Sequence, residues 1–165
     1  MNSSAKGILG IVAIAGAALF TSSTGTAQDA DANAEPTVEV TMNASDIVQS
    51  RRVSFFLSTQ AVSQVKAGID DGGDLRRTVA GARMLAAWAE AIPSMFPAAS
   101  NVAPTRATSA VWDDPDGFAE RAEEYRAAAM ALANAAQQGD RDAANTAFFE
   151  MAAACQTCHQ GYREQ

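Results

Sequence analysis

The chain has 165 residues, of which 48 % are hydrophobic, and it carries a formal net charge of −7. This length is sufficient for one domain with a buried core, and the acidic balance argues against nucleic acid or an anionic membrane surface as a partner. Alanine dominates the hydrophobic fraction, while β-branched and aromatic residues are sparse in the second half. This composition favours helices over strands.

Residues 1–27 have the pattern of a secretory signal peptide. Lys6 precedes an uncharged apolar stretch at 7–20, and Gly25 and Ala27 supply small residues at a cleavage site. The apolar stretch is shorter than the roughly 20 residues that span a bilayer. We therefore expect cleavage after Ala27 and export to the periplasm, with no stable membrane insertion afterwards, rather than an uncleaved anchor.

The mature chain is expected to begin with a flexible leader at 28–44, which shows no sustained period, followed by one folded domain at 45–165. Ser45 or Asp46 is a good N-cap for a first helix that runs to about Ile69. Its apolar positions recur every seven residues, as expected of a helix that faces other helices; they are Val48, Phe55, Val62 and Ile69.

Two further helices follow the first. Asp74 is an N-cap candidate for a helix that Pro93 should end or kink, and residues 98–111 read as a loop. The sequence Asp113-Asp114-Pro115 predicts a clear start for the next helix, which Gly139 should terminate. This helix carries two inward-facing rows of side chains, namely Phe118, Tyr125 and Leu132, and the small residues Ala122, Ala129 and Ala136.

Asp140 should cap the last helix, whose apolar stripe advances by alternating steps of four and three residues. The stripe consists of Ala144, Phe148, Met151, Cys155, Cys158 and Tyr162. Four helices with short connections predict an all-α fold, an antiparallel four-helix bundle. The bundle core would hold whatever the two cysteines bind.

The stripe ends in the motif C-x-x-C-H, formed by Cys155, Cys158 and His159, which are the only cysteines and the only histidine. This spacing is the attachment signature of a covalently bound haem c, in which two thiols bond the haem and the imidazole binds the iron. A zinc site would want four ligands. A disulfide would leave His159 unexplained, and a thioredoxin-like motif would need a βαβ context that the sequence lacks.

The iron has one histidine available, so bis-histidine ligation is excluded. No methionine lies between Ala44 and Arg83, and Phe55, expected over the distal face of the haem, cannot bind iron. We therefore expect a five-coordinate haem that binds NO and CO and transfers single electrons, with no enzymatic turnover. Two alternatives stay open: a six-coordinate Met/His electron carrier in the same bundle, and a haem-free helical interaction module with a redox-active cysteine pair.

Arg51 places a charge on the inward face of the first helix. One interpretation is that its aliphatic stem is buried while its guanidinium reaches water. The other is an ion pair with a haem propionate, which suits the planar, multi-donor head of arginine. Arg163, four residues after His159, should place a second cation beside the axial imidazole.

The residues from Ser45 to Arg163 resemble the cytochrome c′ family of class II c-type cytochromes. The last motif is the most specific, since the family shows C-x-x-C-H-x-x-aromatic-Arg where this chain has Cys155 to Arg163. Weaker similarities are Val48-Gln49-Ser50-Arg51-Arg52, Ile92-Pro93-Ser94-Met95-Phe96, Val111-Trp112-Asp113-Asp114-Pro115 with Phe118, and Gln138-Gly139-Asp140.

The resemblance implies a left-twisted bundle, often a homodimer through its first two helices, with His159 as the sole axial ligand from the protein. It implies haem contacts from Arg51, Arg52, Phe55, Thr105 and Arg106, and a tuning role for Arg163. Arg52 stands where the family usually has Gln, and Phe55 stands where Met or Leu is usual. The redox partner stays unknown.

Overall fold

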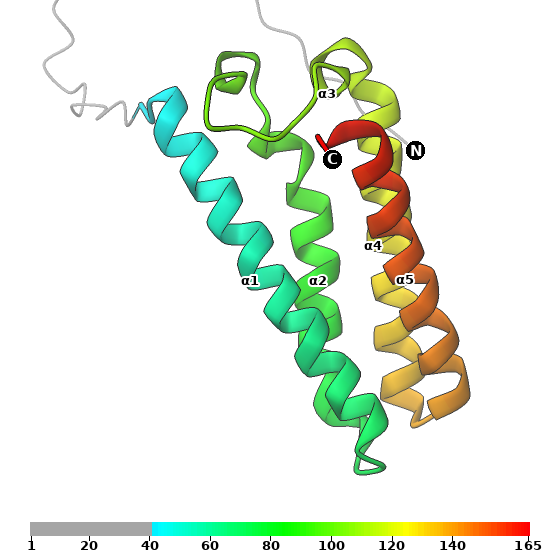
Figure 1. Cartoon of the computed structure of the whole chain (residues 1–165). Helices are drawn as coiled ribbons and strands as arrows, with labels where there is room; N and C mark the ends of the chain where they lie inside the picture. The colour runs from blue at the N-terminus through cyan, green and yellow to red at the C-terminus, as the bar shows by residue number, and fades with distance from the viewer. Residues whose placement is uncertain (1–40) are drawn as a thin grey trace, which may run out of the picture. The chain divides into compact units, whose positions relative to one another are not determined.

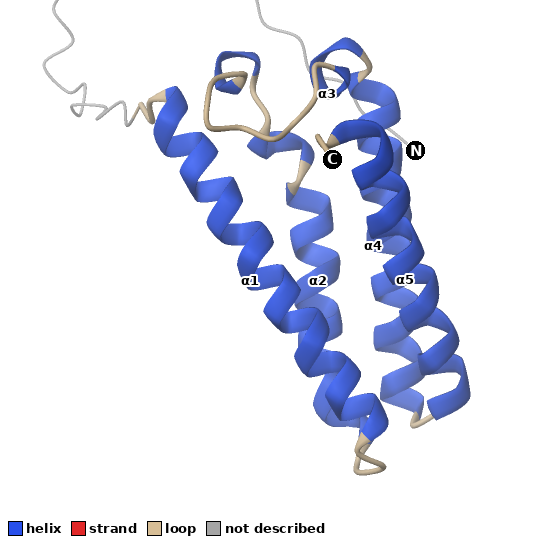
Figure 2. Ribbon diagram, viewed as in Figure 1, coloured by secondary structure: helices blue, strands red, loops and turns tan. Residues whose placement is uncertain are grey.

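The computed structural model describes residues 41–165, which form five α-helices and three short 3₁₀ segments (Figures 1 and 2). The α-helices are α1 (Ala44–Asp70), α2 (Val79–Ala91), α3 (Ala110–Asp113), α4 (Pro115–Gln138) and α5 (Arg141–Tyr162); the 3₁₀ segments are η1 (Leu75–Thr78), η2 (Pro93–Met95) and η3 (Ala98–Ser100). The predicted signal peptide (1–27) and most of the predicted leader (28–44) lie outside the described residues. Within 41–165, no helix combines the length and the apolar character needed to cross a bilayer.

The four long helices α1, α2, α4 and α5 run alternately up and down, which confirms the predicted antiparallel four-helix bundle (Figure 1). The helix α4 packs along both α2 and α5, and α1 packs mainly on α2. By contrast, α1 and α5 share few contacts. Among neighbouring pairs of long helices, α1 and α5 are therefore the least closely packed.

Polar side chains cap the helices at nearly the predicted places. The carboxylates of Asp74, Asp114 and Asp140 accept hydrogen bonds from the backbone N–H groups of Arg76, Gly117 and Ala143, respectively. The predicted N-cap of α1 was wrong. Asn43 caps this helix instead of Ser45 or Asp46, because its Oδ1 accepts from the backbone N of Asp46 at 3.0 Å and so draws residues 44–46 into the first turn.

The core follows the predicted seven-residue rows. Along α4, Phe118, Tyr125 and Leu132 are buried, as are the alanines at 122, 129 and 136. The small alanines let α2 and α5 approach α4 closely, and the α2 residues Leu85 and Ala89 are fully buried. Pro93 ends α2 as predicted, since the chain continues as the 3₁₀ segment η2.

At the end of the bundle where α1 meets α2 and α4 meets α5, one arginine links the two connecting turns. Arg141 donates from Nη1 to the carbonyl oxygen of Ile69, and from Nη2 to that of Gly73 at 2.6 Å. Ile69 is the last buried residue of α1, and Gly73 belongs to the following turn. This side chain therefore connects the start of α5 to the turn between α1 and α2.

Gly139 offers a test of this geometry, since it ends α4 in the left-handed conformation with φ +75°. Gly139→Ala should lower the free energy of unfolding by about 1–2 kcal/mol, because a Cβ is strained in this region. Gln138→Ala, one residue earlier in regular helix, should change it by less than about 0.5 kcal/mol. Denaturant unfolding of both variants measures the difference, and equal stabilities would contradict the assigned turn.

Candidate functional site

A cavity of about 710 Å³ opens at the end of the bundle opposite Arg141, between α1 and α5. Its volume lies within the range usual for ligand pockets. Most of its wall is apolar and comes from α1, α4, α5 and the loop before α3. Residues that line it include Arg51, Arg52, Phe55, Ser58, Thr105, Arg106, Phe118, Arg121, Tyr125, Cys155, Cys158, His159, Tyr162 and Arg163.

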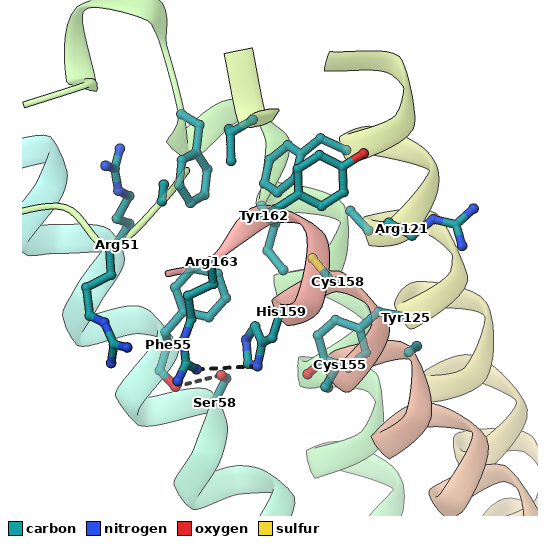
Figure 3. Close-up of a pocket in the computed structure, with 18 of the residues that line it drawn as sticks. Arg51, Phe55, Ser58, Arg121, Tyr125, Cys155, Cys158, His159, Tyr162 and Arg163 are labelled. Carbon is teal, nitrogen blue, oxygen red and sulfur yellow. Dashed lines mark hydrogen bonds between the residues drawn. The ribbon is translucent and has the colours of Figure 1, made fainter. Parts of the chain in front are cut away.

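Cys155, Cys158 and His159 all line this cavity from α5 (Figure 3). The helix is continuous through the motif, so spacings of three and four residues bring the three side chains to one face. Both cysteines are free and half-buried, and His159 is half-buried as well. Two thiols and one imidazole thus meet in a single apolar pocket, as the sequence predicted.

Burial keeps these three groups neutral. It raises the pKa of Cys158 to about 11, with a smaller contribution from the neighbouring Cys155, and it also raises the pKa of Cys155. Burial and then the cation of Arg163 lower the pKa of His159. A neutral imidazole is the form that binds metal. The raised thiol pKa values oppose a redox-active cysteine pair, which requires a stabilised thiolate.

Arg51 is 2 % exposed, so of its two interpretations the one in which the guanidinium reaches water is wrong. Its Nη1 donates to Ser100 Oγ at 2.7 Å and to the carbonyl oxygen of Met95 at 3.4 Å. Its Nη2 donates to Thr105 Oγ1 at 2.7 Å and to the carbonyl oxygen of Ser100 at 3.1 Å. The guanidinium also lies 4.3 Å from the ring centroid of Phe96. These contacts replace water and anchor the loop before α3 to α1.

No carboxylate pairs with Arg51 among residues 41–165, although the side chain lies in the wall of the cavity. Burial lowers the pKa of its guanidinium, which nevertheless stays charged because arginine titrates far above neutrality. A buried cation without an anion is costly. The pocket therefore offers a place for a negatively charged group.

Thr105 and Arg106 lie in the loop before α3, where they line the cavity. This loop pairs with the end of the chain through an isolated bridge between Ala107 and Arg163. The backbone N of Glu164 donates to the Arg106 carbonyl at 2.9 Å, and Arg106 Nη2 donates to the Glu164 carbonyl at 2.8 Å. The rim of the pocket is thus built from two segments far apart in the sequence.

Arg163 and Arg52 complete the basic side chains at the cavity. Arg163 Nη1 lies 3.4 Å from His159 Nδ1, which confirms the predicted placement of a cation beside the imidazole (Figure 3). Arg52 is exposed and lines the cavity from the next position on α1 after Arg51. Both arginines lie at the solvent side of the pocket, since both side chains are exposed.

Phe55 lines the cavity from α1, across from the motif on α5 (Figure 3). Its ring packs edge-on against Trp88 with centroids 5.1 Å apart, and against Phe96 at 6.4 Å. These aromatic contacts hold the ring in place. No methionine lines this cavity within residues 41–165. Met42 and Met84 are more than half exposed, so the pocket wall does not favour a Met/His site.

Several residues that line the pocket or contact its wall had no site role in the sequence prediction. Ser100 is fully buried and accepts from Arg51, but nothing in its local sequence marks a buried serine. Arg121 lines the pocket near Cys158 while pairing with Glu120 and Glu124 on α4. Tyr125 was predicted only as a core residue, and its hydroxyl, whose pKa burial raises, lies in the same wall. The seven-residue row that contains Tyr125 was the available signal.

The chemistry of this pocket fits a covalently attached haem. Its walls are apolar, and both thiols and the sole imidazole line it. The buried guanidinium of Arg51, which has no carboxylate partner, could pair with a haem propionate. The side chains do not converge as a small-ion site, since no group of three or more His, Cys, Asp or Glu with metal-binding geometry occurs within 41–165. A large flat cofactor suits the space better than a single ion.

Comparison with known proteins gives the same answer. The family model described as Cytochrome C′ matches residues 46–163. Curated relatives include cytochrome c′ of Rhodospirillum rubrum, 30 % identical over 83 residues, and that of Pararhodospirillum photometricum, 36 % identical over 84 residues. Each alignment covers 50 % of this chain, with 56 % of the first relative and 67 % of the second. The chain thus spans little more than half the length of the Rhodospirillum rubrum protein.

The fold is shared as well. The crystal structure of cytochrome c′ from Thermochromatium tepidum superposes with a TM-score of 0.68 at 25 % identity, covering 76 % of this chain and all of that chain. The family is one of non-enzymatic haem proteins and implies one covalent haem c. The four-helix bundle, the pocket at its end and the match over residues 46–163 together show that this chain belongs to the cytochrome c′ family.

Proposed function

We propose that this protein holds one haem c in the cavity between α1 and α5, binds small neutral gases such as NO and CO, and transfers single electrons. The observation that carries the proposal is the opening of both thiols and the only imidazole into one apolar pocket. Cys155 and Cys158 would each add an S–H bond across one haem vinyl group, and His159 would be the axial ligand of the iron. When bound, the haem supplies an iron centre that takes a diatomic ligand and changes oxidation state by one electron.

The protein's own residues set the environment of that centre. With haem bound, Phe55 would exclude water from the side of the cavity facing α1, and its ring would leave the iron free to bind a gas because phenylalanine cannot ligate metal. Arg51 would supply a buried positive charge to a haem propionate. Arg52, Thr105 and Arg106 would contact the edge of the haem. Arg163 acts beside the imidazole, whose Nδ1 it approaches at 3.4 Å.

A property of related proteins supports the choice of ligand. One solved structure, 22 % identical to this chain with a TM-score of 0.67, is the nitric oxide complex of a substituted cytochrome c prime from Alcaligenes xylosoxidans. That likeness establishes a shared fold. The proposal that NO is also a ligand here rests on the apolar pocket and on Phe55, because neutral diatomic gases need no hydrogen bond to enter it.

Export and assembly form the second part of the proposal. The family is typically periplasmic, and we infer that residues 1–27 direct export by a cleavable signal. A homodimer through α1 and α2 is supported by the exposed apolar residues Val53, Phe56 and Leu57 on α1 and Met84 on α2. One cytochrome c′ of the same fold, 24 % identical with a TM-score of 0.69, is described as having a ligand-controlled dimer dissociation.

Mass spectrometry of the exported protein tests the assignment of the cofactor. The mature chain should begin at Gln28 and carry one haem that survives denaturation, since thioether bonds are covalent. Cys155→Ser and Cys158→Ser together should abolish the added haem mass. An unsubstituted exported chain without added mass would contradict the proposal and favour the haem-free module.

Phe55 is expected to control gas entry. Phe55→Ala should raise the CO association rate by about tenfold, equivalent to a barrier about 1.4 kcal/mol lower, because the ring no longer fills the distal side. Phe149→Ala is a matched control, since Phe149 is 63 % exposed on α5 and does not line the cavity. Flash photolysis measures both rates. An unchanged rate in Phe55→Ala would show that this ring does not gate the site.

Two substitutions of Arg51 can separate the effect of its positive charge from the effect of its hydrogen bonds to the loop before α3. Arg51→Met and Arg51→Lys should each destabilise the protein by about 1–3 kcal/mol, because both lose the fork that binds Ser100 and Thr105. Only Arg51→Met should lower the reduction potential, since a buried positive charge disfavours the more positive ferric iron. Equal potentials in the two variants would contradict an electrostatic role for Arg51 at the haem.

A further inference from the structure

The last turn of α5 is bound to the start of α4 by a side-chain contact that has no role in the proposed function so far. Tyr162 Oη donates a hydrogen bond to Asp114 Oδ2 at 2.8 Å. The other oxygen of the same carboxylate, Oδ1, accepts from the backbone N of Gly117 at 3.2 Å and caps α4. One carboxylate therefore both starts α4 and holds the end of α5.

Gly117 leaves the space that this contact needs. A Cβ built on Gly117 would lie 2.2 Å from Asp114 Oδ2 and 2.7 Å from Tyr162 Oη, closer than real Cβ atoms approach such oxygens. Glycine within a helix is less favourable than alanine by about 1 kcal/mol. A side chain at position 117 would therefore force the Asp114 carboxylate and the Tyr162 hydroxyl to shift.

The rest of Tyr162 is held from two other directions. Its ring packs edge-on against the buried Phe118, with centroids 5.1 Å apart. Its carbonyl oxygen accepts from the backbone N of Thr108 at 3.1 Å, and Thr108 Oγ1 donates to the Gly161 carbonyl at 3.2 Å. Carbonyls in the last turn of a helix lack intrahelical partners, so these bonds fix a helix end that would otherwise fray.

His159 lies three residues before Tyr162, on the adjacent turn of α5. A helix end that rotates or frays would carry the imidazole with it. We propose that Tyr162, Asp114 and Gly117 form a latch that positions the imidazole of His159 toward the iron, which makes Tyr162 and Asp114 positioning residues. This inference rests on the proposed function, because it assumes that His159 is the axial ligand.

The test uses the haem-bearing mature protein with Tyr162→Phe, which keeps the ring on Phe118 and removes only the hydroxyl. Backbone amides of residues 159–164 should exchange with deuterium about two- to tenfold faster, as expected for the loss of one hydrogen bond. The iron–histidine stretching band in the resonance Raman spectrum of the ferrous protein should shift or broaden. Glu123→Gln is the matched control, because it removes an exposed hydrogen-bonded ion pair on α4, away from Tyr162.

Gly117→Ala provides an independent variant. It keeps the side chains of Tyr162 and Asp114, but its methyl group should push the hydroxyl and the carboxylate apart. Its α4 helix should gain intrinsic stability, yet it should show the same faster exchange at 159–164 and the same change in the Raman band. Unchanged exchange in Tyr162→Phe would overturn the latch. Faster exchange with an unchanged band would reduce it to a structural contact and overturn its positioning role.

Failure of the latch can be distinguished from failure of the proposed function. If the unsubstituted protein lacks haem, the proposed function falls and the positioning role falls with it. If the unsubstituted protein carries haem and binds CO, but neither substitution alters the band, the latch alone is contradicted. The haem mass should be retained in Tyr162→Phe and Gly117→Ala, because Cys155 and Cys158 supply the proposed covalent bonds to the haem.

Discussion

A helical bundle that holds a large cofactor must keep two helices apart at one end without leaving the space between them unsupported. In this chain the constraint falls on α1 and α5, which share few contacts. The alanines of α4 at 122, 129 and 136 let that helix pack closely on α2 and α5. The close packing of α4 on α2 and α5 thus stabilises the bundle, and the pocket lies between α1 and α5.

The opening is supported by contacts between segments that are distant in the sequence. Arg51 joins α1 to Ser100 and Thr105, and the tail joins the same loop through Arg106 and Glu164. A chain of edge-to-face rings runs from Phe55 through Phe96 and Phe118 to Tyr162. Together these contacts link α1, the loop and the end of α5 around the rim. The position of His159 follows from this rim as well as from its own helix.

Much of the fold could be predicted because its determinants are local. The seven-residue rows identified the buried face of α4, and Asp74, Asp114 and Asp140 marked helix starts through their own capping bonds. The C-x-x-C-H spacing placed two thiols and an imidazole on one helical face, and the structure brings them to one pocket. The start of α1 was missed because several consecutive residues are good caps, and only the bond formed by Asn43 selects among them.

The surroundings of the site were less predictable because they depend on long-range contacts. The sequence could not show that Ser100 and Thr105 would meet Arg51, so water was an equally reasonable partner for its guanidinium. The bridge between Ala107 and Arg163 has no periodic signal, and the Tyr162–Asp114 bond joins residues 48 positions apart. Pocket-facing residues such as Arg121 and Tyr125 were visible only as helix surface and helix core.

The central claim is that the pocket between α1 and α5 holds a haem with His159 on one side and an open position beside Phe55 on the other. The optical absorption spectrum of the reduced protein, recorded before and after addition of CO, tests it most directly. A haem bound only by His159 should give a broad high-spin spectrum that changes when CO binds. Sharp low-spin bands in the reduced protein that do not respond to CO would show a sixth ligand from the protein and would contradict it.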